Sequence, residues 1–403
     1  MARQIQNPVN PFFTRIDIPD DFFCDRKKET EEIIQYIRNE KNIVLKSPRR
    51  LGKSSLILHI FKQPDISKHY NTLFVDVFGT KSLSDFVSEF QNALFAAPFA
   101  QTARGRKEFG NLLRNAYIQM NLAPDGLPNG FRLGLAGMPG EDFTLTQIFA
   151  FLEKTGKPNL VVFDEFQKIN AYPEDAAAVI RSHVQRATNT TFIFSGSSRH
   201  MLQKMFENPD EPFYRSATSL ELQPIPQEAY TQFCEEMFTL YGKSIDPDAV
   251  EFVYKLFSGN TFDMQEVMKE TFMNASADVV TTRDDVTNAI HTLLDQRDTE
   301  FKAYLDRIDN QKHRRLLFCI AREGITKGLT SSAMMKRYNL DNASSVQNGL
   351  AFLMSDHINL IMKTGPAEYS LRNRFFELWI ARRDHALDVK IEEILQRKTG
   401  RSE

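Results

Sequence analysis

The sequence has little cysteine, almost no net charge and no long apolar run. Its 403 residues include three cysteines, one tryptophan and a formal net charge of −2. Cys24, Cys234 and Cys319 lie too far apart for metal-ligand spacing, which predicts free thiols in a reducing compartment. No leading apolar segment and no run of about 18 apolar residues occurs, which predicts neither export nor a membrane span. We therefore expect a cytoplasmic protein with no membrane partner.

The length and the charge distribution indicate several domains. A chain of 403 residues exceeds what one hydrophobic core usually supports, so two or three domains are expected. The hydrophobic fraction of 42% and the charged fraction of 25% are typical of a globular protein. Residues 311–403 hold 16 Lys and Arg against 10 Asp and Glu, although the whole chain is slightly acidic. Only this C-terminal part is expected to bind a polyanion.

A phosphate-binding loop follows an expected strand at 42–45 and opens an expected helix at 55–61. The loop reads Ser47-Pro48-Arg49-Arg50-Leu51-Gly52-Lys53-Ser54-Ser55. Ser47 stands where the motif has its first glycine. Backbone N–H groups at the start of a helix bind anions, so we expect Lys53 to meet the β- and γ-phosphates of a nucleotide and Ser54 to ligate Mg²⁺. A chance Gly-Lys-Ser on a surface helix is the alternative.

An apolar run at 159–163 ends in two acidic residues, Asp164 and Glu165. This pattern is typical of a buried parallel strand that delivers carboxylates to its C-terminal end. Beside a phosphate loop, Asp164 is expected to hold the Mg²⁺ shell and Glu165 to polarise a water for attack on the γ-phosphate. An ordinary strand end with solvated acids is the alternative reading.

Two later segments supply further candidate polar groups. The strand expected at 191–194 ends in Ser195-Gly196-Ser197, where ligands bind in open α/β sheets. We interpret Ser197 as the group that orients the attacking water or senses the γ-phosphate, with a plain Ser/Gly turn as the alternative. Arg215 is a candidate to neutralise phosphate charge, in its own chain or in a neighbouring copy. A salt bridge between Arg215 and a surface acid is equally consistent with the sequence.

Strands and helices alternate up to about residue 222, as in a doubly wound sheet. A Gly- and Pro-rich stretch at about 99–141 interrupts this order as an insertion, and the sequence assigns it no role. The pattern is then helical to about 294, with helices at 227–240 and 247–257, and it predicts a lid over the nucleotide. A charged, helical linker follows.

The C-terminal segment has the pattern of a winged helix. Helices are expected at 312–322, 330–338 and 341–355, and strands at 358–362 and 368–371. The polar side chains expected on the exposed face of the third helix are Ser344, Ser345, Gln347 and Asn348. Lys363 lies by the wing, and DNA affinity would depend on residues such as Lys336, Arg337 and Lys363. Because Arg and Lys are scarce on the third helix, protein docking is as consistent with the pattern as DNA binding.

Together these motifs resemble the archaeal-type ATPases, a branch of the AAA+ and STAND P-loop proteins related to the origin-recognition ATPases. The resemblance spans about Phe22–Arg383. The matching positions are Arg49, Arg50, Gly52, Lys53, Ser54, Ser55, Leu56, Asp164 to Gln167, Phe194 to Ser197, Pro212 to Arg215, Phe375 and Trp379. The resemblance implies ATP as the nucleotide, places Phe23 to Arg26 against the adenine, and places Gly259-Asn260-Thr261 near the phosphates.

The sequence as a whole predicts an α/β P-loop core with a parallel sheet, an all-α lid domain and a C-terminal winged helix-turn-helix domain. The expected boundaries are 1–222, 223–300, a linker at 301–311, and 312–403. We expect slow Mg²⁺-dependent ATP hydrolysis that sets a nucleotide-controlled switch, whose winged helix engages a protein or duplex DNA. A homo-oligomer is implied if Arg215 acts across copies. The alternatives are a DNA-binding ATPase of replication, mobile-element or defence processes, and a nucleotide-stabilised scaffold, against which Asp164 and Glu165 argue.

Overall fold

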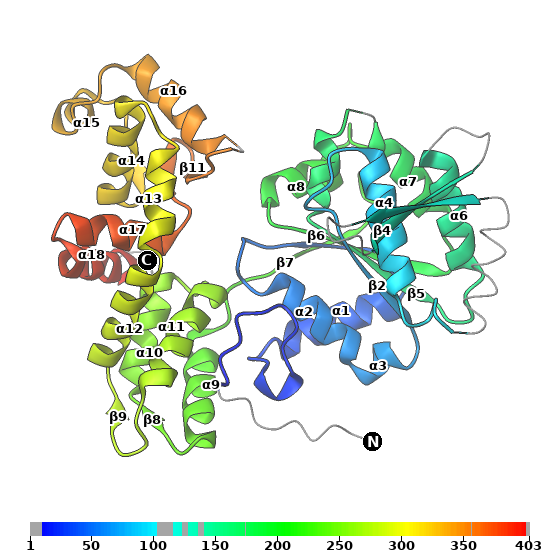
Figure 1. Cartoon of the computed structure of the whole chain (residues 1–403), viewed down its shortest axis with the longest axis horizontal. Helices are drawn as coiled ribbons and strands as arrows, with labels where there is room; N and C mark the ends of the chain where they lie inside the picture. The colour runs from blue at the N-terminus through cyan, green and yellow to red at the C-terminus, as the bar shows by residue number, and fades with distance from the viewer. Residues whose placement is uncertain are drawn as a thin grey trace. The chain divides into compact units, whose positions relative to one another are not determined.

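The computed structural model describes residues 10–102, 116–122, 128–135, 141–173, 175–355 and 357–399, and Figure 1 traces the chain. The chain divides into two compact units, of which the first is Arg15–Ile225. The second unit combines Met1–Thr14 with Pro226–Glu403. The chain therefore passes between the units twice, after Thr14 and after Ile225. None of the helices in the described ranges has the length and apolarity that a membrane span requires.

The first unit is built on a five-stranded parallel sheet with the strand order β2-β5-β6-β1-β7. Its strands are β1 (Ile43–Lys46), β2 (Asn71–Asp76), β5 (Asn159–Asp164), β6 (Thr190–Gly196) and β7 (Thr218–Glu221). The three central strands, β5, β6 and β1, are buried along nearly their whole length. Central parallel strands that are covered on both faces have continuous apolar sequences. The expected α/β core with a parallel sheet is confirmed.

Helices cover both faces of this sheet (Figure 1). One face carries α1 (Lys27–Arg38), α2 (Lys53–Lys62) and α3 (Pro64–Ser67). The other carries α4 (Leu83–Ala96), α6 (Glu141–Glu153), α7 (Ala176–Arg186), α8 (Arg199–Glu207) and the 3-10 helix η2 (Phe166–Ala171). Strand side chains alternate between the two cores: Leu160 and Val162 join the first, whereas Val161 and Phe163 join the second. The second core is rich in phenylalanine, whose rings pack against one another between the sheet and these helices.

The expected insertion contains an antiparallel hairpin that the sequence pattern did not indicate. β3 (Ala116–Leu122) pairs with β4 (Pro128–Leu135), from Ala116 opposite Leu135 to Leu122 opposite Pro128. Pro128 and the two glycines of β4, Gly130 and Gly134, explain why the pattern did not indicate a strand, because both residue types are depleted in strands. The rest of the stretch up to Glu141 lies mostly outside the described residues.

The second unit begins with helices α9 (Gln227–Leu240), α10 (Pro247–Phe257), α11 (Thr261–Asn274) and α12 (Arg283–Gln296). The first two coincide with their expected ranges. The short strands β8 (Ser244–Ile245) and β9 (Val280–Thr281) pair in parallel between these helices. The N-terminal segment is anchored here, because the ring of Phe12 is 1% exposed and packs at about 6 Å from those of Phe233, Phe238 and Phe272. A lid role for these helices stays a prediction.

The winged helix follows α13 (Asp298–Asp306). It contains α14 (Gln311–Glu323), β10 (Thr326–Lys327), α15 (Ser332–Arg337), α16 (Ala343–Met354), β11 (Ile361–Gly365) and β12 (Glu368–Leu371), and α17 (Arg374–Arg383) and α18 (Leu387–Thr399) complete the unit. The expected helices and the second strand are present. The first strand of the expected hairpin is also present, but its expected start at 358 was three residues too early, since β11 begins at Ile361. Asn359 is left-handed (φ 51°) and its N–H donates to Ser355 O at 2.8 Å, so a turn occupies these positions. The two-residue strand β10 also joins the wing sheet.

The three cysteines are buried, free thiols, as expected. Burial, with the Glu323 carboxylate nearby, raises the pKa of Cys319 to about 12. This thiol is therefore protonated at neutral pH and is a poor nucleophile.

Candidate active site

The phosphate loop joins β1 to α2 at the C-terminal end of the sheet. Arg50 (φ 69°) and Gly52 (φ 84°) both adopt the left-handed conformation, and Gly52 immediately precedes α2. Ser47 is fully buried: its N–H donates to Gly196 O at 3.3 Å, and its hydroxyl donates to Pro48 O at 2.8 Å. The loop therefore accommodates serine at the usual glycine position, because the small side chain is satisfied by the loop's own backbone.

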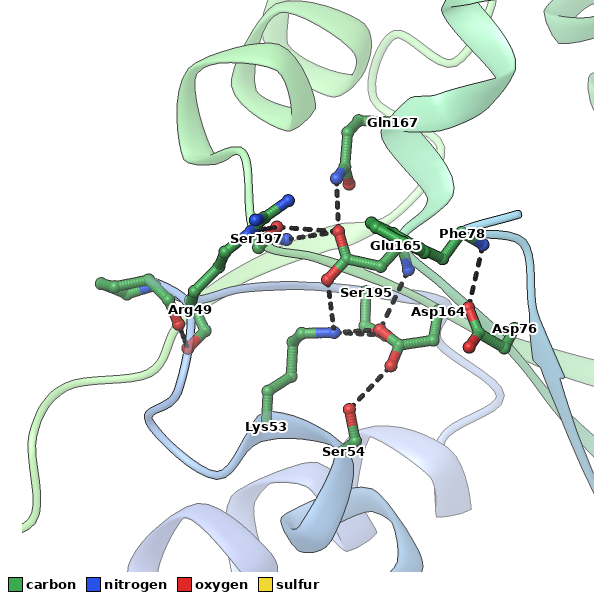
Figure 2. A network of polar contacts seen from close by, with 12 residues as sticks. Arg49, Lys53, Ser54, Asp76, Phe78, Asp164, Glu165, Gln167, Ser195 and Ser197 are labelled. Carbon is green, nitrogen blue, oxygen red and sulfur yellow. Dashed lines mark hydrogen bonds and ion pairs between the residues drawn. The ribbon is translucent and has the colours of Figure 1, made fainter. Parts of the chain in front are cut away.

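Lys53, Ser54 and Asp164 form a compact polar network at the mouth of this loop (Figure 2). The Lys53 ammonium forms an ion pair with Asp164 Oδ1. The Ser54 hydroxyl donates to Asp164 Oδ2 at 2.7 Å, and the Ser195 hydroxyl donates to Oδ1 at 2.7 Å. These groups come from α2, β5 and β6, so the parallel pairing of the strands brings together residues more than a hundred positions apart.

The pKa values of two carboxylates at this end of the sheet, Asp164 and Asp76, shift in opposite directions. Burial alone would raise the pKa of Asp164, but the Lys53 charge and the hydrogen bonds from Lys53, Ser195 and Ser54 outweigh it, so the pKa is lowered. Asp76 lies opposite Asp164 in the strand register. Its pKa is raised, first by desolvation and then by the Asp164 and Glu165 charges, against a hydrogen bond from the Phe78 N–H. The lowered pKa keeps Asp164 ionised and suited to bind a cation.

Glu165 turns away from the strand through a left-handed backbone conformation (φ 57°). Its Oε2 accepts hydrogen bonds from Gln167 Nε2 at 2.6 Å and from the Ser197 hydroxyl at 2.7 Å. Its Oε1 lies 3.8 Å from Lys53 Nζ. Arg49 Nε donates to the Ser197 hydroxyl at 3.3 Å, so the expected base, the expected sensor and the phosphate loop form one connected chain of contacts.

The donors at the loop fit a magnesium ion that is shared with a nucleotide. Mg²⁺ prefers hard oxygen ligands and usually takes only one or two from the protein, with phosphates and waters completing the shell. Ser54 Oγ and Asp164 Oδ2 are adjacent oxygens of this kind. Within the described ranges, no cluster of three or more His, Cys, Asp or Glu residues has the arrangement of a metal site. The residues therefore suit a nucleotide-bound Mg²⁺ better than a protein-only metal.

Arg26, which we expected near the adenine, is 3% exposed and its guanidinium is occupied by protein groups. It donates to Gln223 O at 2.6 Å and to Leu51 O at 3.2 Å, and it pairs with Glu29 at 2.6 Å. One side chain thus connects the phosphate loop to the segment that follows β7. The neighbouring Phe23 ring stacks on His59, with centroids 4.1 Å apart.

Arg215 is not brought to this network. Its backbone N–H donates to Phe206 O at 3.0 Å, and its guanidinium lies 5.0 Å from the centre of the Tyr214 ring. β7 begins three residues later with Thr218 opposite Ile43, at the N-terminal end of β1, whereas the phosphate loop leaves the C-terminal end. Arg215 therefore lies toward the opposite end of the sheet from its own phosphate loop.

The lid segment expected near the phosphates belongs to the second unit. Gly259 is left-handed (φ 71°), and Asn260 caps α11 by accepting a hydrogen bond from Asp263 N at 3.3 Å. This turn separates α10 from α11, and the left-handed Gly259 and the Asn260 cap account for its conformation. Its approach to the nucleotide stays a prediction.

Sequence reasoning assigned no role to Ser195 or Gln167, although both touch the site carboxylates. Ser195 is fully buried and also lies 3.4 Å from Lys53 Nζ. The sequence pattern could have indicated Ser195, because this hydroxyl lies at the end of an otherwise apolar strand, β6, whose parallel neighbour β5 ends at Asp164. Gln167 gave no such signal, since its contact depends on the turn at Glu165.

Comparisons with known proteins agree with this geometry. A family model described as "ATPase domain predominantly from Archaea" matches residues 23–267, and one described as "Probable winged helix domain" matches residues 299–382. A search of curated protein sequences finds no match.

Among solved structures, the fold is similar to a Walker-type ATPase of Pyrococcus abyssi (16% identity, TM-score 0.61, covering 92% of this chain and 99% of that one). It is also similar to the ORC2 protein of Aeropyrum pernix in ADPNP-ADP complexes (14%, 0.53, 98% and 97%). The ORC1 protein of Aeropyrum pernix in complex with DNA is a third (13%, 0.50, 93% and 97%). With the ATPase model covering more than half of the chain, this protein belongs to the family of ATPase domains found predominantly in Archaea: it is a P-loop ATPase with a C-terminal winged helix.

Proposed function

We propose that the protein is a slow, Mg²⁺-dependent ATPase that acts as a nucleotide-controlled switch. The observation that carries the proposal is the position of Arg26. Its guanidinium holds Leu51 O of the phosphate loop and Gln223 O, three residues before the chain enters the second unit at Pro226. A change in loop conformation is therefore transmitted to a covalent connection between the units. A ligand shifts such an equilibrium only through contacts that differ between the two states.

The site residues supply those contacts. In the structure Lys53 is paired with Asp164, and Arg49 with Ser197. A γ-phosphate would compete for Lys53 and for the Ser197 hydroxyl, so these pairs exist in one state and give way in the other. When bound, Mg²⁺ would be held by Ser54 and Asp164 and would neutralise charge on the phosphates.

In the hydrolytic step, Glu165 takes a proton from a water whose oxygen attacks the γ-phosphorus. The bond from that phosphorus to the bridging oxygen breaks, which leaves ADP and inorganic phosphate. Ser197 lies beside Glu165 and orients the water, while the Lys53 ammonium stabilises charge on the transferred group.

The surface of the winged helix indicates the kind of partner that the switch would engage. The exposed face of α16 presents Ser344, Gln347 and Asn348 and carries no charged residue. Many basic side chains around it form ion pairs, as Lys312 does with Asp341 and Arg337 with Glu323. These features favour a protein partner for the winged helix.

A second candidate is DNA binding. The exposed Lys336 and Lys363, together with the excess of basic residues after position 311, favour a polyanion. One of the similar structures, at 13% identity, is a complex with DNA. Replication, mobile-element or defence roles remain the corresponding processes for this candidate.

The deciding experiment measures ATP turnover by the full chain at low salt, with and without a mixed-sequence DNA duplex. Turnover that is unaffected by DNA and altered by Arg26→Ala supports the protein-partnered switch. Turnover stimulated by DNA supports the second candidate. The switch proposal fails if Arg26→Ala changes neither turnover nor the nucleotide-dependent protease sensitivity of the segment around Pro226.

A further inference from the structure

We propose that Gln167 is a positioning residue for Glu165, and that Gly196 provides the space in which it acts. The inference rests on the proposed role of Glu165 as the base. Gln167 lies on η2, two residues after Glu165, and it is 4% exposed. Its Nε2 donates to Glu165 Oε2 at 2.6 Å. Figure 2 shows the amide against one carboxylate oxygen and Lys53 against the other.

The two carboxylate oxygens of Glu165 have unequal surroundings. Oε2 accepts from Gln167 Nε2 and from the hydroxyl of Ser197, and the Ser197 N–H lies within 3.4 Å of it. Oε1 faces the Lys53 ammonium at 3.8 Å, too far for a hydrogen bond. Because Oε2 is held by donors from two different elements, the carboxylate cannot exchange its oxygens freely. Oε1 is therefore the oxygen left on the phosphate side to accept a proton from water.

The orientation of the Gln167 amide follows from the carboxylate. An ionised carboxylate only accepts hydrogen bonds, so the amide NH₂ must face Glu165. The amide oxygen Oε1 then points away from Glu165, and it is buried without a hydrogen-bond partner in the described part of the chain. Leaving a buried carbonyl unpaired costs stability. Contact with Glu165 explains why the amide is held in this orientation despite that cost.

Gly196 is the residue that admits the Gln167 side chain. A Cβ at Gly196 would lie 1.9 Å from Gln167 Oε1, closer than non-bonded atoms approach, and it would make tight contacts with Gln167 Cδ at 3.0 Å and Leu202 Cδ1 at 3.1 Å. The backbone of Gly196 is not among the left-handed glycines, so alanine would suit its conformation. Space, rather than backbone freedom, therefore requires glycine at this position. Any side chain there must displace the amide from Glu165.

The test uses steady-state ATP turnover by the full chain. Gln167→Ala is expected to lower kcat about 10- to 100-fold, because a loosely held base loses its alignment with the water. The KM for ATP should change by less than about threefold, since Gln167 lies on the far side of Glu165 from Lys53. Gly196→Ala should reproduce this loss by moving the amide.

The double variant separates positioning from simple destabilisation. In Gln167→Ala the clashing amide is gone and the 3.1 Å contact with Leu202 Cδ1 remains, so adding Gly196→Ala should cause little further loss of kcat. If Gly196→Ala acted only by weakening β6, the two losses would multiply. Multiplying losses, or a kcat of Gln167→Ala equal to that of the wild type, would overturn the inference. If Gly196→Ala fails to fold, the kcat of Gln167→Ala and the pH profile of Gln167→Glu still test whether Gln167 positions Glu165.

A charge substitution gives a readout that a structural role would not produce. Gln167→Glu places a second carboxylate beside Glu165, and two carboxylates this close share a proton. The acid limb of the kcat–pH profile should therefore move to higher pH by about one unit or more. The matched control is Gln35→Glu on the exposed face of α1, which should leave the profile unchanged. An unshifted profile for Gln167→Glu would contradict the proposal.

Glu165→Gln distinguishes failure of this inference from failure of the proposed function. If Glu165→Gln retains turnover, the base assignment is wrong and the role of Gln167 falls with it. If Glu165→Gln is inactive while Gln167→Ala matches the wild type, only the positioning role is wrong.

Discussion

The phosphate site and the winged helix use their polar groups in different ways. In the site, Lys53, Asp164, Glu165 and Ser197, which come from three different parts of the chain, contact one another in one connected network. On α16 the exposed side chains are uncharged, and the cations nearby are mostly paired at the surface. Surface ion pairs contribute little, about 0–1 kcal/mol. Charged side chains that converge in a buried place therefore identify a functional site, whereas an exposed surface of uncharged side chains and paired cations does not by itself identify a partner.

Lys53→Ala should have the largest effect, because it removes the cation that we propose meets the phosphates and leaves Asp164 without its ion pair. We expect nucleotide affinity to fall by at least about 100-fold, or roughly 2.7 kcal/mol. Titration with a fluorescent ATP analogue measures this directly. Lys62→Ala, at the exposed end of the same helix, is the control and should bind normally. Normal binding by Lys53→Ala would remove the phosphate-loop assignment.

Glu165→Gln should separate binding from chemistry. The amide keeps the shape of the side chain but cannot take a proton, so turnover should fall about 10²- to 10⁴-fold while ATP affinity is retained. Single-turnover hydrolysis and equilibrium binding on the same preparation test both parts. Retained turnover would refute Glu165 as the base.

Arg215→Ala tests whether the site is completed by a second copy of the chain. Arg215 lies toward the opposite end of the sheet from its own phosphate loop, so any action on a nucleotide must occur in trans. If it does, turnover should fall roughly 10²-fold or more. Mixing Arg215→Ala with Glu165→Gln chains should then restore part of the activity, because some sites combine an intact Glu165 with an intact Arg215. If Arg215→Ala turns over ATP at the wild-type rate and mixing restores no activity, Arg215 is a surface residue with no role at the nucleotide.

Paired substitution of Lys336 and Lys363 by alanine tests whether the winged helix binds DNA. If the domain binds DNA, affinity for a duplex should weaken about tenfold or more at low salt, and the dependence of log K on log salt should become shallower by about one for each lost phosphate contact. Lys302→Ala on α13 is the control. No measurable duplex binding by the wild type would leave the protein-partnered switch as the explanation.

The smallest effect is expected from Asp76→Asn. The folded-state pKa of Asp76 is raised, chiefly by desolvation and also by Asp164 and Glu165, so its ionised form destabilises the fold above the ordinary aspartate pKa of about 3.9. Asparagine removes this penalty, but Asp76 is exposed and solvent screens its charge, so the thermal midpoint at pH 7 should rise by no more than about 1 °C. Near pH 3, where the carboxyl is largely protonated, the gain should vanish. An equal gain at both pH values would point to a packing effect instead.

Much of the site could be predicted because its chemistry is local in sequence. The loop from Ser47 to Ser54 and the acids at 164 and 165 each follow an apolar strand, and parallel strands must end at one edge of a sheet. The amide of Gln167 could not be placed, because its direction depends on the left-handed turn at Glu165. The start of β11 was missed for a related reason, since a single left-handed residue, Asn359, delays the strand.

Strand periodicity and loop motifs are properties of neighbouring residues, so the amino-acid sequence was enough to predict a P-loop ATPase with a helical region and a winged helix. Three features became visible only in the folded chain: Arg26 connects the phosphate loop to the segment just before the second unit, Arg215 lies away from its own loop, and one oxygen of Glu165 is held by Gln167 and Ser197 while the other faces Lys53. The physical reason is that strand register and close packing join residues from distant segments. Such contacts leave no periodic trace in the sequence.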